Sequence, residues 1–248
     1  MKRLIFTLLL TILLFSCGIG GSSNAKNTAT AQPQPLKIVV IEDFSYSQTK
    51  ERKIPIEVLF ELANRIAKCG GILSYGIITG DSFKPFTELV IEQPPLSPEQ
   101  TDEKNPFKKA KKEAKLVANQ QHETVLKTRQ IDNDNKIAAF LNTVERIKKK
   151  TPLARSSDVN NAFARAAMTV CAPNSGFSQE PKTFVIVASD LINDWIGGNR
   201  ERFRGFDCTL KNPILVVGAQ GCGNLELAEG TYLNLQSIEE AKRYVFAH

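Results

Sequence analysis

The stretch LKIVVIEDFSYS, residues 36–47, decides the fold. Its first half, residues 36–41, is mostly apolar and rich in β-branched side chains, which is typical of a strand buried on both faces of a sheet. The second half places Asp43, Ser45 and Ser47 at alternate positions. Alternate side chains of an extended segment point to the same side, so these oxygen-bearing groups share one face. The stretch therefore predicts a central strand that ends in a polar cluster.

Strand-like and helix-like patterns alternate along the rest of the chain. This alternation predicts an α/β fold with right-handed crossovers: a doubly wound, mostly parallel sheet with helices on both faces. The segment 87–92 follows closely on the preceding strand and is expected to form a hairpin with it. Expected strands cover residues 72–79, 87–92, 184–188, 213–218 and 231–235, and expected helices begin near Pro55, Asp158 and Ser237.

Residues 99–150 interrupt this alternation with a basic, helix-favouring insertion. The part from 104 to 150 carries 13 Lys/Arg against 5 Asp/Glu, a net charge of +8. Its second half repeats apolar residues at helical spacing and so has a packing face. The pattern allows one long kinked helix, or two helices that break near residues 132–135. The charge is consistent with a solvated face or with contact to anionic lipid or an acidic envelope polymer.

The N-terminus has the features of an export signal followed by a tether. Lys2 and Arg3 precede an apolar run over residues 4–15. This run is too short to span a bilayer, which takes about 20 residues. Residues 18–35 are rich in Gly, Ser, Asn, Gln and Pro and cannot bury enough apolar surface to fold. The expected organisation is therefore a signal at 1–16, a tether at 17–35 and one α/β domain at 36–248.

The end of the apolar run carries a more specific pattern. Leu14-Phe15-Ser16-Cys17 resembles the lipobox of bacterial lipoproteins, in which the cysteine is acylated and becomes the new N-terminus. The resemblance implies a lipid on Cys17 and a place on a membrane of the bacterial cell envelope, the outer membrane in a Gram-negative cell. An uncleaved hydrophobic anchor and a conventional signal are the alternatives. Nucleic acid, another usual partner of basic segments, is not expected for an exported protein.

Four further cysteines bear on the fold, because an export signal would place them where disulfides persist. In alternating α/β order, Cys171 ends a helix and Cys208 precedes a strand, so both should lie at the sheet end opposite the polar cluster. Cys69 also ends a helix there, whereas Cys222 follows a strand and should lie at the other end. A Cys171–Cys208 bridge is the preferred pairing. The sequence has only two histidines and no CxxC pair, so it offers few of the residues that a zinc site or a Ser-His-Asp centre needs.

A distant carboxylate is expected to meet the polar cluster. Asp190 follows the strand at 184–188. In a doubly wound sheet, that strand and the first one flank the point where strand order reverses, and ligands bind there. Carboxylate and hydroxyl oxygens are hard donors suited to magnesium. Two structural alternatives stay open: Asp43 and the serines could satisfy backbone donors at a turn, and Asp190 could cap a following helix.

In its strand context, Asp43-x-Ser45-x-Ser47 resembles the DxSxS motif of the von Willebrand factor A domain, where it builds a metal-ion-dependent adhesion site. A threonine before a helix and an aspartate after a later strand complete that site, and Ser157 and Asp190 occupy the matching positions here. The resemblance covers residues 36–248 apart from the insertion. Two departures are the serine at 157 and Leu191, which stands where the family usually has glycine.

The resemblance implies a non-enzymatic protein-binding module. Mg²⁺, or Mn²⁺ or Ca²⁺, would be held directly or through water, and its open position would take a carboxylate from an envelope or extracellular protein. One alternative is an envelope scaffold with a vestigial metal site, whose basic insertion contacts anionic lipid or an acidic partner. Another is an enzyme with Asp43 as nucleophile, but Lys182 lies at the wrong end of its strand to assist. The implied ligands are Asp43, Ser45, Ser47, Ser157 and Asp190.

Overall fold

The computed structural model describes residues 32–46, 53–80, 82, 84–96, 108–174, 176–192, 203, 205–219 and 231–248, with side chains in the long helix described from residue 114. The predicted signal, the lipidation of Cys17 and most of the predicted tether lie outside these residues. The predicted ligand Ser47 and Cys222 also lie outside them.

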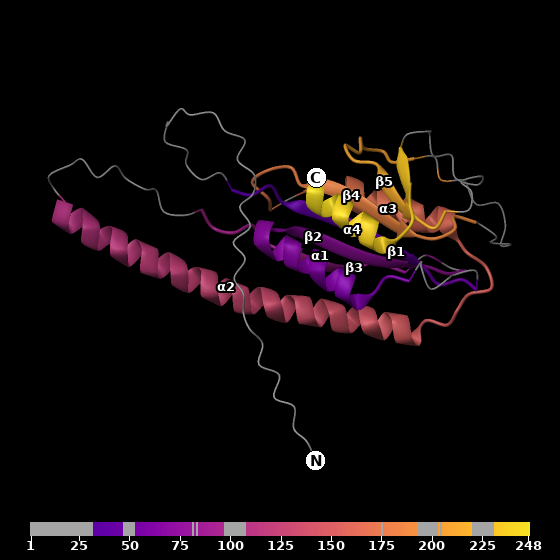
Figure 1. The fold of residues 1–248 in the computed structure, drawn as a ribbon, viewed down its shortest axis with the longest axis horizontal. Coiled ribbons are helices and arrows are strands. Elements are labelled where there is room, and N and C mark those ends of the chain that lie inside the picture. The colour runs from indigo at the N-terminus through magenta and orange to yellow at the C-terminus, as the bar shows by residue number, and fades with distance from the viewer. Residues whose placement is uncertain are drawn as a thin grey trace, which may run out of the picture. The chain divides into compact units, whose positions relative to one another are not determined.

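A six-stranded sheet organises the described residues (Figure 1). Its strands are β1 (Leu36–Asp43), β2 (Gly71–Ile78), β3 (Thr87–Ile91), β4 (Lys182–Ala188), β5 (Ile214–Val217) and β6 (Tyr232–Leu235). Their order across the sheet is β3-β2-β1-β4-β5-β6. Neighbouring strands are parallel except for β2 and β3, which pair in antiparallel fashion. The predictions of a mostly parallel sheet and of a hairpin at its edge are confirmed.

Four described helices connect or flank these strands: α1 (Ile56–Cys69), α2 (Lys108–Lys150), α3 (Val159–Cys171) and α4 (Ile238–Ala247). Side-chain hydrogen bonds explain where α3 and α4 begin. The Asp158 carboxylate accepts the Asn161 N–H at 3.4 Å, and the Ser237 hydroxyl accepts the Glu240 N–H at 3.3 Å. Both are N-cap hydrogen bonds, which satisfy donors that a helix leaves unpaired in its first turn. The capping pattern predicted at Ser237 is therefore present.

The segment predicted to be an insertion contains one helix of 43 residues, α2, so the alternative of two helices is wrong. Three features support helical structure at and beside the polar stretch 132–135. Asp132 and Lys136 form an ion pair at 2.7 Å across one turn. Asn133 is buried, and Arg129 donates to the carbonyl oxygens of Glu92 and Gln93 just after β3. Tertiary contacts thus outweigh the weak helix propensity of these residues.

Two apolar cores lie on opposite faces of the sheet, because successive strand side chains point to opposite sides. Ile38 and Val40 of β1 belong to the first core, which α1, α4 and the second half of α2 cover. Val39 and Ile41 belong to the second core, which α3 covers. Figure 1 shows α1 and α4 lying over the strands and α2 running beside α1. Helices on both faces of the sheet are therefore observed, as expected.

The amino ends of the central strands meet the last turn of α3. Lys37, which is buried, donates to the carbonyl oxygens of Thr169, Val170 and Ala172 at 3.1–3.2 Å. At the same end of α3, Cys171 forms a disulfide with Cys208, with 5.5 Å between the Cα atoms. Among the described helices, none combines the length and apolar character needed to cross a bilayer.

Candidate functional site

Asp43 ends the central strand and is 1% exposed. Its Oδ1 accepts the Ser45 N–H at 2.9 Å, which is the turn-forming role expected as a structural alternative. Its Oδ2 accepts the Ser189 hydroxyl at 2.8 Å. The register explains this second bond: Glu42 pairs with Ala188, so Asp43 lies beside Ser189, the residue that follows β4. Asp43 therefore joins the carboxyl ends of β1 and β4.

Asp190 brings a second buried carboxylate to this edge of the sheet. It is 1% exposed, and its Oδ1 accepts the Ile192 N–H at 3.1 Å. Burial raises the pKa of Asp43, hydrogen bonds from Ser189 and Ser45 lower it, and the negative charge of Asp190 raises it again. The two acids are thus close enough to repel each other electrostatically. They lie where the strand order reverses, the usual place for a ligand in such a sheet.

Leu191, which follows Asp190, has a left-handed backbone conformation, which is uncommon for a residue other than glycine. Its φ is +61°, in the left-handed region, and its side chain is fully buried in the core beneath α3. A bulky residue there is strained, and such strain persists only where surrounding contacts impose it. One such contact is visible, because the Ser189 hydroxyl oxygen accepts the Leu191 N–H at 3.0 Å. Ser189 therefore fixes both Asp43 and the turn that carries Asp190.

The segment 154–158 is tied to the same edge at two points. Ala154 pairs with the chain around Ser45, through bonds of 3.0 Å from the Tyr46 N–H and 2.7 Å to the Phe44 carbonyl. Farther along, the Asp158 N–H donates to the carbonyl of Thr79 at 2.8 Å. Ser157 lies between these ties and is 2% exposed.

The structure thus brings Asp43, Ser45 and Asp190 to one edge and places Ser157 on the adjoining segment. Within the described part of the chain, no three Asp, Glu, His or Cys side chains are grouped to hold a metal ion. The predicted set has two carboxylates and relies on hydroxyls for its other donors. Asp43 accepts hydrogen bonds from the Ser189 hydroxyl, the Ser45 hydroxyl and the Ser45 N–H, and the two oxygens of a carboxylate together offer about four lone pairs. The donors therefore fit a hard cation bound directly or through water.

Ser189 was missed as a site residue, although the sequence carried a signal for it. Once the first strand and the strand at 184–188 are taken as parallel neighbours, the residues just past their ends must face one another. Ser189 is the residue that then stands opposite Asp43.

Glu42, the residue before Asp43, was also missed, and nothing local could have revealed its role. It is 1% exposed and faces the other side of the sheet. Its Oε2 accepts the Tyr75 hydroxyl at 2.7 Å and the Lys148 ammonium at 2.7 Å, while Oε1 accepts the Ile54 N–H at 3.1 Å. Lys148 is 106 residues away in the chain.

No protein-family model, curated protein or solved structure matches the chain. Any function assigned to it therefore rests on its own residues, with the buried pair Asp43 and Asp190 first among them.

Proposed function

We propose that the chain is a membrane-tethered, non-enzymatic protein-binding module that holds a divalent cation at the carboxyl ends of β1 and β4. The observation that carries the proposal is the burial of Asp43 and Asp190 together: burial raises the pKa of Asp43, and the charge of Asp190 raises it further. Two buried acids oppose each other's ionisation, and a bound cation would offset that repulsion. Mg²⁺ is the expected ion, with Mn²⁺ or Ca²⁺ as substitutes, because the donors are oxygens.

The likeness to a von Willebrand factor A domain belongs to this proposal. It is supported by the antiparallel edge strand β3 in an otherwise parallel sheet. In this reading Asp43, Ser45, Ser47, Ser157 and Asp190 hold the cation, and Ser189 positions Asp43.

Binding rather than catalysis follows from what these residues would do. With their oxygens engaged by the cation, they supply charge and geometry, and the open coordination position would accept a carboxylate of a partner protein. A lipid on Cys17 would fix the chain to the bacterial envelope membrane. Residues 18–31 would then link the lipid to the domain, so that the proposed metal site could meet an envelope or extracellular partner. The predicted tether is shorter than expected, because residues 32–35 form hydrogen bonds with the domain.

Calorimetric titration of the purified protein with MgCl₂ and MnCl₂ tests the cation site. We expect binding heat in the wild type and at least about a tenfold loss of affinity in Asp43→Asn, which keeps an acceptor for the Ser45 N–H. The matched control is Asp134→Asn, an exposed carboxylate on α2, which should bind as the wild type does. A wild type that shows neither heat nor affinity for either ion would refute the proposal.

The second candidate is an envelope scaffold with a vestigial metal site, whose basic helix contacts anionic lipid or an acidic partner. Its support is the first half of α2, where Leu116 and Val125 are 59% and 53% exposed among lysines. We expect the protein to pellet with anionic vesicles without any divalent ion, and to do so less when the lysines at 108, 109, 111, 112 and 115 are changed to glutamine. Vesicle binding that is unchanged by these substitutions would count against this candidate.

A further inference from the structure

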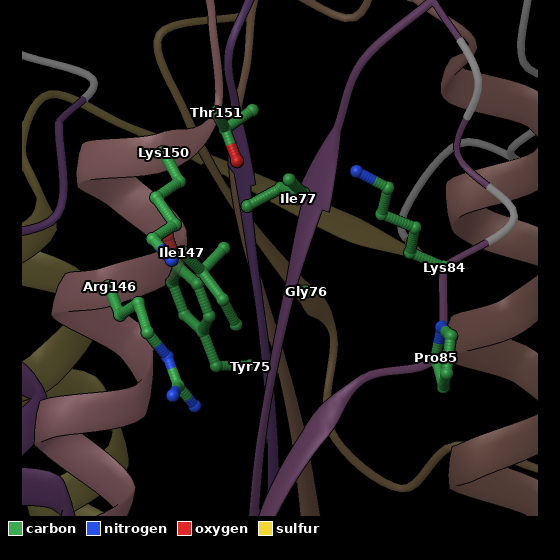
Figure 2. Close-up of a pocket in the computed structure, with 9 residues that line it drawn as sticks. All are labelled: Tyr75, Gly76, Ile77, Lys84, Pro85, Arg146, Ile147, Lys150 and Thr151. Carbon is green, nitrogen blue, oxygen red and sulfur yellow. The ribbon is translucent and has the colours of Figure 1, made fainter.

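A pocket of about 370 Å³ opens where β3 leaves β2. The ladder between these strands ends at the pair Tyr75–Thr87, and before Thr87 the chain turns away from the last residues of β2. The final turns of α2 close the other side. Figure 2 shows the α2 residues on one side of β2 and Lys84 with Pro85 on the other. The lining consists of Tyr75, Gly76, Ile77, Lys84, Pro85, Arg146, Ile147, Lys150 and Thr151.

The charged residues of this lining are all cations: Lys84, Arg146 and Lys150. Arg146 and Lys150 are four residues apart on α2 and so share one face of the helix. Neither they nor Lys84 form an ion pair with another described residue. The two lysines between Arg146 and Lys150 do: Lys148 pairs with Glu42 at 2.7 Å and Lys149 with Glu145 at 3.0 Å. The end of α2 therefore pairs two of its cations with acids of the chain and leaves Arg146 and Lys150, which line the pocket, without an ion pair to a described residue.

Two described residues near Lys84, Ser82 and Phe86, make contacts with the rest of the domain. The Ser82 hydroxyl donates to the Thr79 carbonyl at 3.2 Å, and Arg165 of α3 donates to the Ser82 carbonyl at 2.5 Å. The Arg165 guanidinium also lies 4.8 Å from the centre of the Phe86 ring. In Figure 2 the Lys84 ammonium points toward Ile77. The third cation is thus directed across the pocket toward the strand.

The inner part of the pocket is apolar. Tyr75 and Ile77 are 1% and 8% exposed, and Ile147 and Pro85 complete this surface. The Tyr75 hydroxyl is engaged by Glu42, so the ring acts as an apolar wall. An apolar base with a few convergent polar groups is the usual make-up of a small-molecule site.

We propose that this pocket binds a small organic anion whose doubly charged acidic group meets Lys84, Arg146 and Lys150 and whose apolar part lies against Tyr75 and Ile77. The site goes beyond the proposed cation-dependent binding, because it lies at the end of β2 and shares no residue with the metal ligands. A phosphate monoester and a dicarboxylate both carry the required charge, and an anion would offset the mutual repulsion of the three cations.

The test is calorimetric titration with phenyl phosphate, phthalate and inorganic phosphate in buffer free of divalent metal and at constant ionic strength. We expect phenyl phosphate or phthalate to bind, with the tighter of the two identifying the acidic group. Inorganic phosphate, which lacks the apolar part, should bind more weakly. The double variant Arg146→Gln, Lys150→Gln should raise the dissociation constant about tenfold or more, because it removes two charge-assisted contacts.

The matched control is Lys149→Gln, which removes a cation of the same helical turn that does not line the pocket. We expect it, and Asp43→Asn, to bind the anion as the wild type does. Lys84→Gln tests the opposite wall and should also weaken binding, independently of any effect of the double variant on α2. The proposal is overturned if the wild type binds neither organic anion at millimolar concentration, or if Lys149→Gln weakens binding as much as the double variant.

Discussion

Glu42 and Asp43 are neighbours on β1 that meet opposite surroundings. Both carboxylates are 1% exposed, and strand geometry turns them to opposite faces of the sheet. Glu42 meets the ammonium of Lys148, the hydroxyl of Tyr75 and a backbone N–H. Asp43 meets neutral donors from Ser45 and Ser189, and its charged neighbour among the described residues is another acid, Asp190.

This difference in surroundings marks the Glu42 carboxylate as structural and the Asp43 carboxylate as a candidate functional group. Burying a carboxylate is costly unless a cation and hydrogen bonds balance it. The chain supplies that cation to Glu42 and thereby ties the end of α2 to the centre of the sheet. At Asp43 the described chain supplies hydrogen bonds and a second negative charge. The proposed function assigns the balancing cation on this face to the solution, and this is the reason to place the candidate site there.

The largest effect is expected on the Glu42 side. Lys148→Met leaves a buried carboxylate without its cation and should lower the free energy of unfolding by about 3 kcal/mol. The control Lys149→Met breaks only an exposed pair and should cost less than about 0.5 kcal/mol. Urea denaturation measures both. Equal losses in the two variants would show that the Glu42 pair is not the structural anchor described here.

A smaller effect is expected from the second partner of Glu42. Tyr75→Phe removes a buried hydroxyl that donates to a charged oxygen at 2.7 Å. The expected loss in unfolding free energy is about 1.5 kcal/mol, the usual worth of a hydrogen bond to a charged group. An unchanged urea midpoint would mean that the Lys148 pair alone balances Glu42.

The comparison is sharpest when each acid is made neutral. Glu42→Gln should lower the unfolding free energy by about 2 kcal/mol, because it discards a balanced ion pair with Lys148. Asp43→Asn should not lower it in metal-free buffer at pH 7. The folded-state pKa of Asp43 is raised above the ordinary 3.8, so ionising this carboxyl costs stability. The cost grows from the unfolded-state pKa to the folded-state pKa and is complete above it. Loss of stability in Asp43→Asn comparable to that in Glu42→Gln would contradict the distinction.

The smallest expected effect on the unfolding free energy comes from replacing Lys37, at the other end of β1, and this effect depends on pH. Burial lowers its pKa below the ordinary 10.5. Between these two values the unfolded chain holds a proton that the folded chain has lost, so the unfolding free energy rises with pH in that window. Lys37→Met should lack this rise when unfolding is followed by urea from pH 7.5 to 10.5. Identical pH slopes in the two proteins would show that Lys37 does not titrate differently on folding.

Local patterns were enough for the strands, the capped helices and the edge hairpin. Apolar runs and caps act over a few residues, so each can be recognised without knowing the rest of the fold. The Cys171–Cys208 disulfide present in the structure is the pairing expected from strand and helix direction. The sequence also placed Asp43 just beyond the first strand, whereas the structure makes it the last residue of β1.

Long-range contacts account for what the sequence did not show. The continuity of α2 through residues 132–135 depends on contacts after β3, and the burial of Glu42 depends on a lysine far along the chain. The pocket beside β2 needs Lys84 and Arg146 brought together by the packing of α2. None of these pairs leaves a periodic or spacing signal, because each joins segments that meet only in the folded chain.

The central claim is that a divalent cation binds between Asp43 and Asp190. The most direct measurement is a crystal structure of the protein soaked in manganese, read from the anomalous difference map. We expect a peak in contact with both carboxylates, directly or through water, and no such peak in Asp43→Asn. A wild-type map without a peak at this edge, with both acids bonded only to protein, would contradict the claim.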